Sequence, residues 1–315
     1  MALSINELNS VSKKYFDETL TQQVYEKSPF FAKLKADKKV KTDGGTSMQW
    51  TIRYKELDNA KATGPRSKVD FSSEETRTGA DIDWTYYDAQ TLIHWDEQVK
   101  NSGKGKIIDL VKDKSAEVLE DLQNKLYKAV FATSGTEGTD LEYLSKIVDS
   151  GAAYGGIAVA DASEWASAED SSTTTLKLFG DASLSYMRNQ ATFGTEQPTM
   201  HITTRDLVSK FESLLQPQQR YEDKTMANLG FSAMTFHGVP VLGDVFCPAG
   251  YWYGLDMKAF ELREHSDYGL TVGDWFELPQ AGYPNAKAKY VSWVGNLLAR
   301  RRNTSFKFSA LDYTL

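Results

Sequence analysis

The sequence predicts an α+β fold, and three segments support this prediction. Residues 104–132 carry apolar side chains at helical spacing, whereas residues 46–54 and 80–93 alternate between polar and apolar side chains, as half-buried strands do. Residues 231–262 are rich in Val, Phe and Tyr and are interrupted by Gly, Pro and Asp, a pattern typical of several short strands joined by tight turns. Helix and strand signals are both strong, and they occupy different parts of the chain.

Length and composition are those of a globular protein. The chain has 315 residues, enough for roughly two domains, and 41% of them are hydrophobic against 25% that are charged. Its net charge of −7 disfavours a surface that embraces nucleic acid as a whole, because such surfaces depend on Lys and Arg. The single cysteine, Cys247, excludes an intramolecular disulfide framework. Without an apolar run of about 18 residues or a secretory signal, we expect no membrane contact and synthesis in the cytoplasm.

The first forty residues are the least globular part of the chain. Apolar residues at three- and four-residue spacing predict an amphipathic helix over residues 7–27, which ends before a Ser-Pro pair. The next segment combines two aromatic residues, Phe30 and Phe31, with a run of lysines. Two interpretations stay open, a solvated charged tail and an arm that docks on a neighbouring subunit through the two rings.

A long hairpin is predicted from the two alternating segments. Residues 46–54 and 80–93 would form its strands, and the polar residues 56–79 between them would form an extended tip. Since an isolated two-stranded ribbon is only marginally stable in water, this hairpin must lie on its own domain or on another chain. The charged residues of the tip are therefore candidates for contacts between subunits: Lys61, Arg66, Lys68, Asp70, Glu74 and Glu75.

One helix is the strongest element of the sequence. At about 1.5 Å per residue, a helix over 104–132 spans about 40 Å, enough to form the backbone of an elongated domain. Farther along, a strand at 200–203 leads into a helix at 206–215, which Thr204 is positioned to cap. Residues 287–311 then return to a strand pattern.

Three consecutive arginines, Arg300, Arg301 and Arg302, lie in this C-terminal segment. Because side chains alternate across a strand, the three cannot all face one nucleic acid ligand. We interpret them as contacts between subunits that pair with the acidic surplus of neighbouring copies.

Motifs of known catalytic sites are absent from the sequence. It contains no Gly-rich phosphate loop, no dinucleotide fingerprint, no His-Glu-x-x-His and no Gly-x-Ser-x-Gly. His94 and Asp96 could form half of a metal or acid–base pair, but no partner motif accompanies them. Cys247 could act as a nucleophile beside His237 or His265, although its strand-and-turn context favours a place in the core. The sequence therefore predicts neither an enzyme nor a cofactor or metal site.

The turns within 231–262 are similar in order to those of the major capsid proteins of tailed bacteriophages. Gly-x-Pro-Val at 238–241 is followed by Gly-Asp at 243–244, Cys-Pro at 247–248 and Tyr-Gly-Leu-Asp at 253–256. The order of elements along the whole chain also resembles that family: an N-terminal segment, a long hairpin, a long helix, a mixed middle and C-terminal strands. This resemblance implies the Hong Kong 97-type capsid fold.

In that fold the chain would divide as the family does. The resemblance implies an N-terminal arm at 1–42, an E-loop hairpin at 43–95, a peripheral domain with its spine helix at 96–140, an axial domain at 141–284, and the closing strands of the peripheral domain at 285–315. A separate scaffolding protein is expected, because no room exists before the arm for the long scaffolding segment that some relatives carry.

The resemblance also implies a function. The chain would be a major capsid protein that self-assembles into pentamers and hexamers of an icosahedral head around double-stranded DNA, and it would reside in the virion after assembly in the host cytoplasm. Expected partners are further copies of the chain, scaffolding protein, portal and packaged DNA through weak non-specific contact, with a decoration protein left open. An encapsulin-like compartment shell of the same fold is the alternative, and an enzyme of unrecognised type is a third interpretation.

Some relatives join their subunits through a Lys–Asn bond. Lys61 or Lys68 in the hairpin tip and Asn296 or Asn303 near the C-terminal strands are the right residue types. No motif aligns them, so we expect non-covalent assembly.

Overall fold

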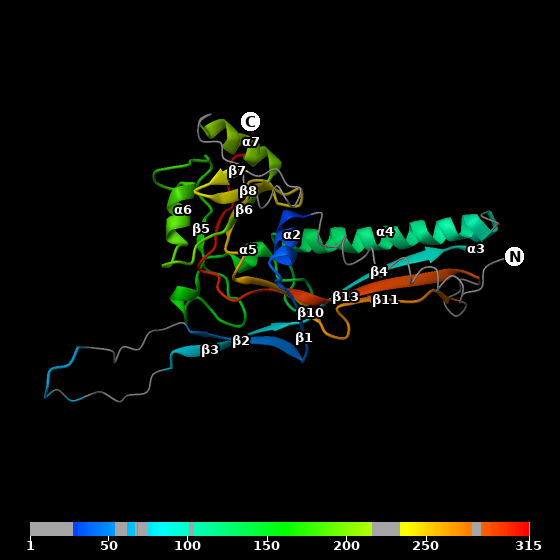
Figure 1. The fold of residues 1–315 in the computed structure, drawn as a ribbon, viewed down its shortest axis with the longest axis horizontal. Helices are drawn as coiled ribbons and strands as arrows, with labels where there is room; N and C mark the ends of the chain where they lie inside the picture. Colours follow the sequence, from blue (N-terminus) through cyan, green and yellow to red (C-terminus); the bar gives the residue numbers. More distant parts are fainter. Residues whose placement is uncertain are drawn as a thin grey trace.

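The computed structural model describes residues 28–53, 62–66, 68, 75–100, 104–215, 234–278 and 285–314. The predicted helix at 7–27 lies outside these residues, as do Lys61, Asp70 and Glu74 of the hairpin tip. Within the described part, helices and sheets form an elongated body (Figure 1). No helix of this part is long and apolar enough to cross a membrane.

The first sheet is built around one long strand, β13 (Lys287–Ala299). Strand β4 runs antiparallel to it over nine residue pairs, from Lys287 opposite Ile93 to Gly295 opposite Thr85. Both edges of β13 are therefore used, by β4 on one side and by β10, β11 and β12 on the other. The other strands of this sheet are β1 (Val40–Asp43), β4 (Thr85–Ile93), β10 (Phe260–His265), β11 (Leu270–Val272) and β12 (Phe276–Glu277).

Helix α4 (Lys104–Val130) packs along the first sheet, against β4 and β13 (Figure 1). Its C-terminal half contributes Val118, Leu122, Leu126 and Val130, all nearly fully buried, at helical spacing. The helix predicted at 104–132 is thus confirmed. Its amphipathic pattern reflects one face on the sheet and one in solvent.

The second sheet has the strand order β5-β14-β9-β6-β8-β7. Strand β6 is buried at all four positions, because β8 and β9 flank its edges and side chains cover both faces. Where β9 and β14 pair, the Phe306 ring lies over Gly254, so that a Cβ on this glycine would lie 2.2 Å from the ring. The strands of this sheet are β5 (Ala168–Asp170), β6 (Met200–Thr203), β7 (Met234–Phe236), β8 (Val239–Gly243), β9 (Trp252–Leu255) and β14 (Phe306–Phe308).

Two helices accompany the second sheet, α6 (Leu184–Gln190) and α7 (Arg205–Leu214). Leu207 and Phe211 of α7 are fully buried in a cluster with Trp252 of the sheet. The cap predicted for α7 is confirmed, because the Thr204 hydroxyl accepts a hydrogen bond from the Leu207 N–H at 3.4 Å. The strand predicted at 200–203 and the short strands predicted within 231–262 are confirmed as well.

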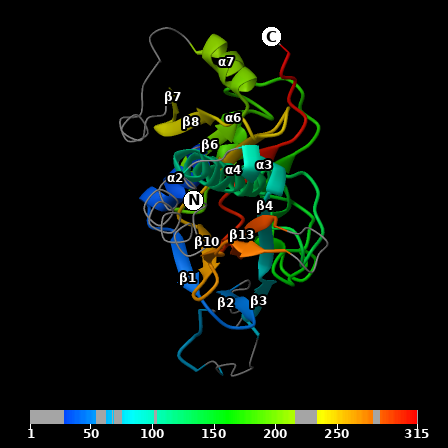
Figure 2. The same cartoon turned by 90° about the vertical axis from the view of Figure 1, so that its right-hand side faces the viewer.

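A two-stranded ribbon projects from the body opposite α7 (Figures 1 and 2). Strands β2 (Ser47–Arg53) and β3 (Arg77–Asp83) pair antiparallel, with Trp50 opposite Ala80. The predicted hairpin is confirmed for β2 and for residues 80–83 of β3, which begins at Arg77 within the predicted tip. It is wrong for residues 85–93, which form β4 and pair with β13. The alternating pattern runs through both strands and identifies them as strands. It carries no information about their partners.

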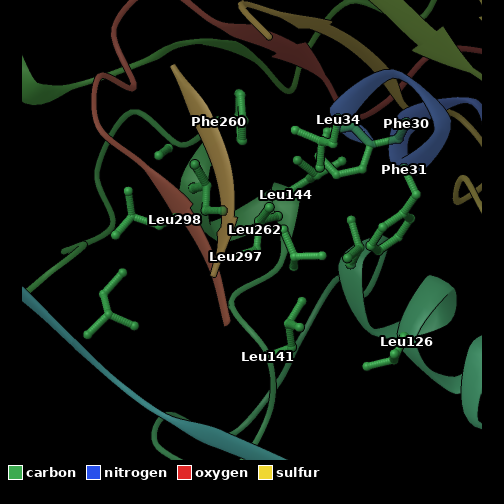
Figure 3. Close-up of a cluster of buried hydrophobic side chains, with 14 of the residues drawn as sticks. Phe30, Phe31, Leu34, Leu126, Leu141, Leu144, Phe260, Leu262, Leu297 and Leu298 are labelled. Carbon is green, nitrogen blue, oxygen red and sulfur yellow. The ribbon is translucent and has the colours of Figure 1, made fainter. Parts of the chain in front are cut away.

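The main core joins the two sheets, and Figure 3 shows part of it. It combines side chains of the first sheet, such as Leu262 and Leu297, with Ile202 and Leu255 of the second. Three short elements contribute side chains to it: α2 (Pro29–Ala36), α5 (Leu144–Ile147) and the 3-10 turn η1 (Ser163–Trp165). A further helix, α3 (Trp95–Lys100), follows β4.

Candidate assembly surfaces

The β2–β3 ribbon carries its apolar residues on one face only. Trp50 and Ile52 of β2 and Ile82 of β3 are buried against the body, whereas Arg53 and Asp81 of the opposite face are exposed. The Trp50 ring lies 6.2 Å from the Tyr154 ring, between centroids. The base of the ribbon is therefore part of this subunit, and only its outer face and the tip are left for other partners.

The tip residues that the structure describes are exposed. Arg66 and Lys68 lie at the far end of the ribbon, and Glu75 precedes β3. Their exposure leaves them accessible to a neighbouring copy. Their role in contacts between subunits stays a prediction.

Phe30 and Phe31 lie in the interior of the subunit, where Figure 3 shows them beside Leu34 of the same helix. The two rings are 0% and 2% exposed. Phe30 meets the rings of Phe131 and Phe260 edge-on at 6.3 and 6.0 Å between centroids. The interpretation of this pair as a docking arm is therefore wrong, because both rings are buried in the core of their own subunit. The sequence could not show this, since the rings that surround Phe30 come from distant parts of the chain.

The start of helix α2 is also fixed within the subunit, by a hydrogen bond. Ser28, directly before the helix, is fully buried, and its hydroxyl donates a hydrogen bond to Asp244 Oδ2 at 2.5 Å. Asp244 also accepts from the Phe246 N–H through Oδ1 at 2.9 Å. Ser28 is thus tied to the turn after β8 of its own subunit.

The three arginines after β13 separate into two groups. Arg300 and Arg301 are exposed, and the Arg300 Nε lies 3.0 Å from Glu261 Oε1. Arg302 is 0% exposed and donates to the carbonyl oxygens of Ala152, at 2.8 Å, and of Asp149. The prediction of an intersubunit contact is therefore wrong for Arg302, which joins the 149–152 loop to the C-terminal segment of its own subunit.

A second buried cation, Lys307, has no signal in the sequence beyond its place in an alternating strand. It is 3% exposed, and its ammonium contacts Ser145 O at 2.8 Å, Asp149 Oδ2 at 3.0 Å and Glu169 Oε1 at 3.1 Å. Burial alone would raise the pKa of Asp149, but the N–H groups of Gly151 and Ala152 and the Lys307 ammonium lower it. This network links β14 to the α5 region and is structural.

Aromatic side chains gather on the outer face of the first sheet. Tyr86 of β4 and Tyr290 of β13 are 68% and 45% exposed, and their register places them on the same face. Phe276 of β12 meets Tyr290 edge-on at 6.2 Å between ring centroids. Exposed aromatic groups of this kind are enriched where proteins bind one another.

Two of the residues considered for catalysis, Cys247 and His94, have different surroundings. Cys247 is buried, and burial followed by the charge of Asp244 raises the pKa of its thiol well above the ordinary value. A thiol held neutral is a poor nucleophile, and the prediction that Cys247 fills core is confirmed. His94 is exposed, and its backbone N–H donates to Glu97 Oε2 at 3.3 Å. In the described ranges, no group of three or more His, Cys, Asp or Glu is arranged to hold a metal ion.

Asn296 and Asn303 both serve the subunit's own structure. Asn296 is 2% exposed, and its side chain accepts from the Glu142 N–H and donates to Asp83 O, at 2.8 and 2.9 Å. Asn303 donates to Glu164 O at 3.0 Å.

No protein-family model matches the chain, and no curated protein matches it by sequence. Solved structures do match. A chain of the Cyanophage A-1(L) capsid asymmetric unit is 15% identical, with 87% of this chain and 90% of that chain covered and a TM-score of 0.58. A chain of the satellite phage P4 procapsid that includes the size determination (Sid) protein is 12% identical, with 94% and 92% covered and a TM-score of 0.51.

A chain of the SrpI encapsulin complex of Synechococcus elongatus PCC 7942 is similar as well. It is 11% identical, with 100% of this chain and 98% of that chain covered and a TM-score of 0.53. Likenesses at such low identity establish fold, and here they extend over nearly the whole chain. The chain therefore has the Hong Kong 97-type capsid fold that its sequence predicted.

Proposed function

We propose that this chain is the major capsid protein of a tailed bacteriophage and that its copies form the pentamers and hexamers of an icosahedral head around double-stranded DNA. The observation that carries the proposal is the capsid fold over nearly the whole chain, with phage capsid structures prominent among its matches. These structural neighbours are shell proteins, which favours a structural role over an enzymatic one.

The shape of the subunit supports this proposal. The β2–β3 ribbon leaves the body, and the described residues of its tip, 62–66 and 68, are exposed (Figure 1). A ribbon of two strands is marginal in water, so the tip requires a surface to lie on. A neighbouring copy supplies such a surface in a shell. The E-loop in this proposal begins at β2 and ends at β3, because β4 belongs to the first sheet.

Further partners belong to the same proposal. A separate scaffolding protein would guide assembly, a portal would occupy one vertex, and a decoration protein is left open. The P4 procapsid structure includes the size determination protein Sid, which is an example of an additional protein in such a particle. The net charge of −7 favours only weak, non-specific contact with packaged DNA. The assembled protein would reside in the virion after assembly in the host cytoplasm.

Replacement of residues 58–76 by a short Gly-Ser turn tests the proposal. Exposed ion pairs are each worth about 0–1 kcal/mol and are screened by salt, so the tip contributes little to one subunit and much to a shell that repeats the contact. We expect the melting temperature of the isolated subunit to change by a few degrees at most, while negative-stain images show no regular shells. As a control, exchange of the exposed Lys177 and Asp181 for Ser should leave shells intact.

Two outcomes contradict parts of the proposal. Regular shells from the replacement variant would show that 58–76 is not an intersubunit loop. A wild-type chain that stays a compact monomer at high concentration, with and without scaffolding protein, would contradict the capsid assignment itself.

An encapsulin-like compartment shell is the second candidate, favoured by the likeness to the SrpI encapsulin complex. The contents of purified particles separate the two. Nuclease-protected double-stranded DNA in particles from infected cells supports the capsid, whereas particles that hold a protein cargo and no DNA support the compartment.

A further inference from the structure

Two small cavities flank the base of the β2–β3 ribbon. One is lined by Asp81, Ile82 and Asp83 of β3, and the other by Thr51, Ile52 and Arg53 of β2. The Asp81 N–H donates to Gly155 O at 3.1 Å, so the first cavity lies along the edge of β3 that faces away from β2. The two cavities thus open at opposite edges of one ribbon.

The cavity along β3 is acidic. Asp81 and Asp83 of the ribbon meet Glu137 and Glu142 of the loop that follows α4, and Lys146 is the cation bonded to this group. The cavity holds about 90 Å³, which at about 30 Å³ per water is room for the end of one side chain. Four carboxylates line it, and the charges of Lys146 and Arg302 act on one of them, Glu142.

Glu142 gives this cavity an unsatisfied acceptor. Glu142 is 7% exposed, and its Oε1 accepts a hydrogen bond from Lys146 Nζ at 2.8 Å. Its other oxygen, Oε2, is buried and has no hydrogen-bond partner among the described residues. Burial raises the pKa of this carboxyl group, against the opposing effect of Lys146. Because an unpaired oxygen of a buried carboxylate is destabilising, an incoming N–H donor would be favoured here.

The cavity along β2 is basic. Arg53, Arg300 and Arg301 line it together with one acidic residue, Glu164. It holds about 260 Å³, more than its acidic counterpart. Asn303 also lines it, and the Oδ1 of this residue is buried without a partner in the part of the chain that the structure describes. The ribbon therefore separates a negative edge from a positive one.

Of the three arginines at this edge, Arg301 is best placed to reach another subunit. Arg300 is engaged by Glu261, a residue 3% exposed that also accepts from Lys41 at 2.7 Å, and Arg53 lies on the ribbon itself. The Arg301 side chain is exposed and follows β13, where the chain has left the sheet. A guanidinium group there can donate several hydrogen bonds to carboxylates.

We propose that the basic edge of one copy docks against the acidic edge of the next copy, with Arg301 reaching the cavity lined by Asp81, Asp83 and Glu142. The inference rests on the proposed function, and it names the surfaces that close the capsomer. Two different, complementary patches on opposite edges form a head-to-tail contact between copies. Such a contact generates a closed ring when the rotation from one copy to the next adds up to a full turn. Charge complementarity also fixes the order of neighbours and speeds their encounter.

Charge reversal tests this pairing. Asp81→Lys/Asp83→Lys places positive charge at the acidic edge, and Arg301→Glu places negative charge at the basic edge. We expect each variant alone to form at least tenfold fewer rings than wild type, as measured by mass photometry, because like charges then face each other across the contact. The control Asp113→Lys/Asp181→Lys has the same change in charge at exposed sites away from the ribbon and should assemble like wild type. Circular dichroism melts verify that each variant folds.

A mixture of the two variants gives the sharpest result. Each reversed edge then faces the reversed edge of the other variant, and each unchanged edge faces an unchanged one, so alternating rings are allowed. Alternation closes only with an even number of subunits. We therefore expect the mixture to restore hexamers and not pentamers, and the triple variant Asp81→Lys/Asp83→Lys/Arg301→Glu to restore both.

The outcomes are distinguishable. Failure of the wild-type protein to form rings contradicts the proposed function and this inference together. Rings of normal yield from both single-edge variants contradict this inference alone. Loss of rings on chelation with EDTA, together with normal rings from Arg301→Glu, would mean that a divalent cation occupies the acidic cavity, and the pairing would be wrong.

Discussion

Truncation of Phe30 to alanine should destabilise the isolated subunit and not merely its assembly. The ring is fully buried, and it meets Phe31, Phe131 and Phe260 edge-on at 5.6, 6.3 and 6.0 Å between centroids. Removal of a buried Phe side chain costs about 3–5 kcal/mol, and aromatic pairs are worth about 0.5–1.5 kcal/mol each beyond burial. With three such pairs lost, we expect the upper half of this range, about 4–5 kcal/mol.

Urea unfolding at low protein concentration measures this effect. Mass photometry first verifies that only single subunits are present, and tryptophan fluorescence then follows unfolding of Phe30→Ala and wild type. The matched control is Phe179→Ala, because Phe179 is 59% exposed and should contribute about 1 kcal/mol or less. A free energy of unfolding for Phe30→Ala within about 0.5 kcal/mol of wild type, together with lost assembly, would refute the reasoning and restore the docking arm.

The remaining predictions concern two buried groups of the second sheet and its turns. His201 is 0% exposed, accepts from Trp252 Nε1 at 3.3 Å, and has its pKa lowered to about 3 by burial. In the unfolded chain the pKa of this histidine is about 6.5, so between pH 6.5 and 3 the unfolded chain binds more protons than the folded one. The free energy of unfolding should fall by about 1.4 kcal/mol for each pH unit below about 6.5. Urea titrations of His201→Gln should show a weaker dependence on pH. Parallel plots of this free energy against pH for the variant and wild type would contradict the prediction. Cys247→Ala should cost about 1–2 kcal/mol and leave shells intact, and iodoacetamide at pH 8 should modify wild-type Cys247 only as fast as the subunit opens. Rapid labelling of intact particles would show that the thiol is accessible.

Local patterns in the sequence were sufficient for the type and place of the main elements. The helix α4, the strand β6 with the Thr204 cap after it, and the short strands between 231 and 262 all follow from side-chain periodicity and turn chemistry. These signals act between residues a few positions apart, and the chain carries them whatever lies around it. The order of these elements was enough to indicate the fold.

The partners of these elements were decided by the tertiary structure. Residues 80–93 read as one alternating run, yet residues 80–83 join the ribbon and residues 85–93 join β13. The same limit affected the candidate contacts. Arg66 and Lys68 are exposed as expected, but the aromatic pair Phe30 and Phe31 is buried.

The arginines after β13 show the physical reason. Arg301 and Arg302 are identical and adjacent, and the sequence favours neither as a surface residue. Arg302 is buried because the 149–152 loop places two carbonyl oxygens around its guanidinium group, which offset the loss of water, whereas Arg301 points to the exposed side. Those oxygens come from residues some 150 positions away along the chain. Periodicity decides which residues form helices and strands, and only the folded structure decides which distant groups surround each side chain.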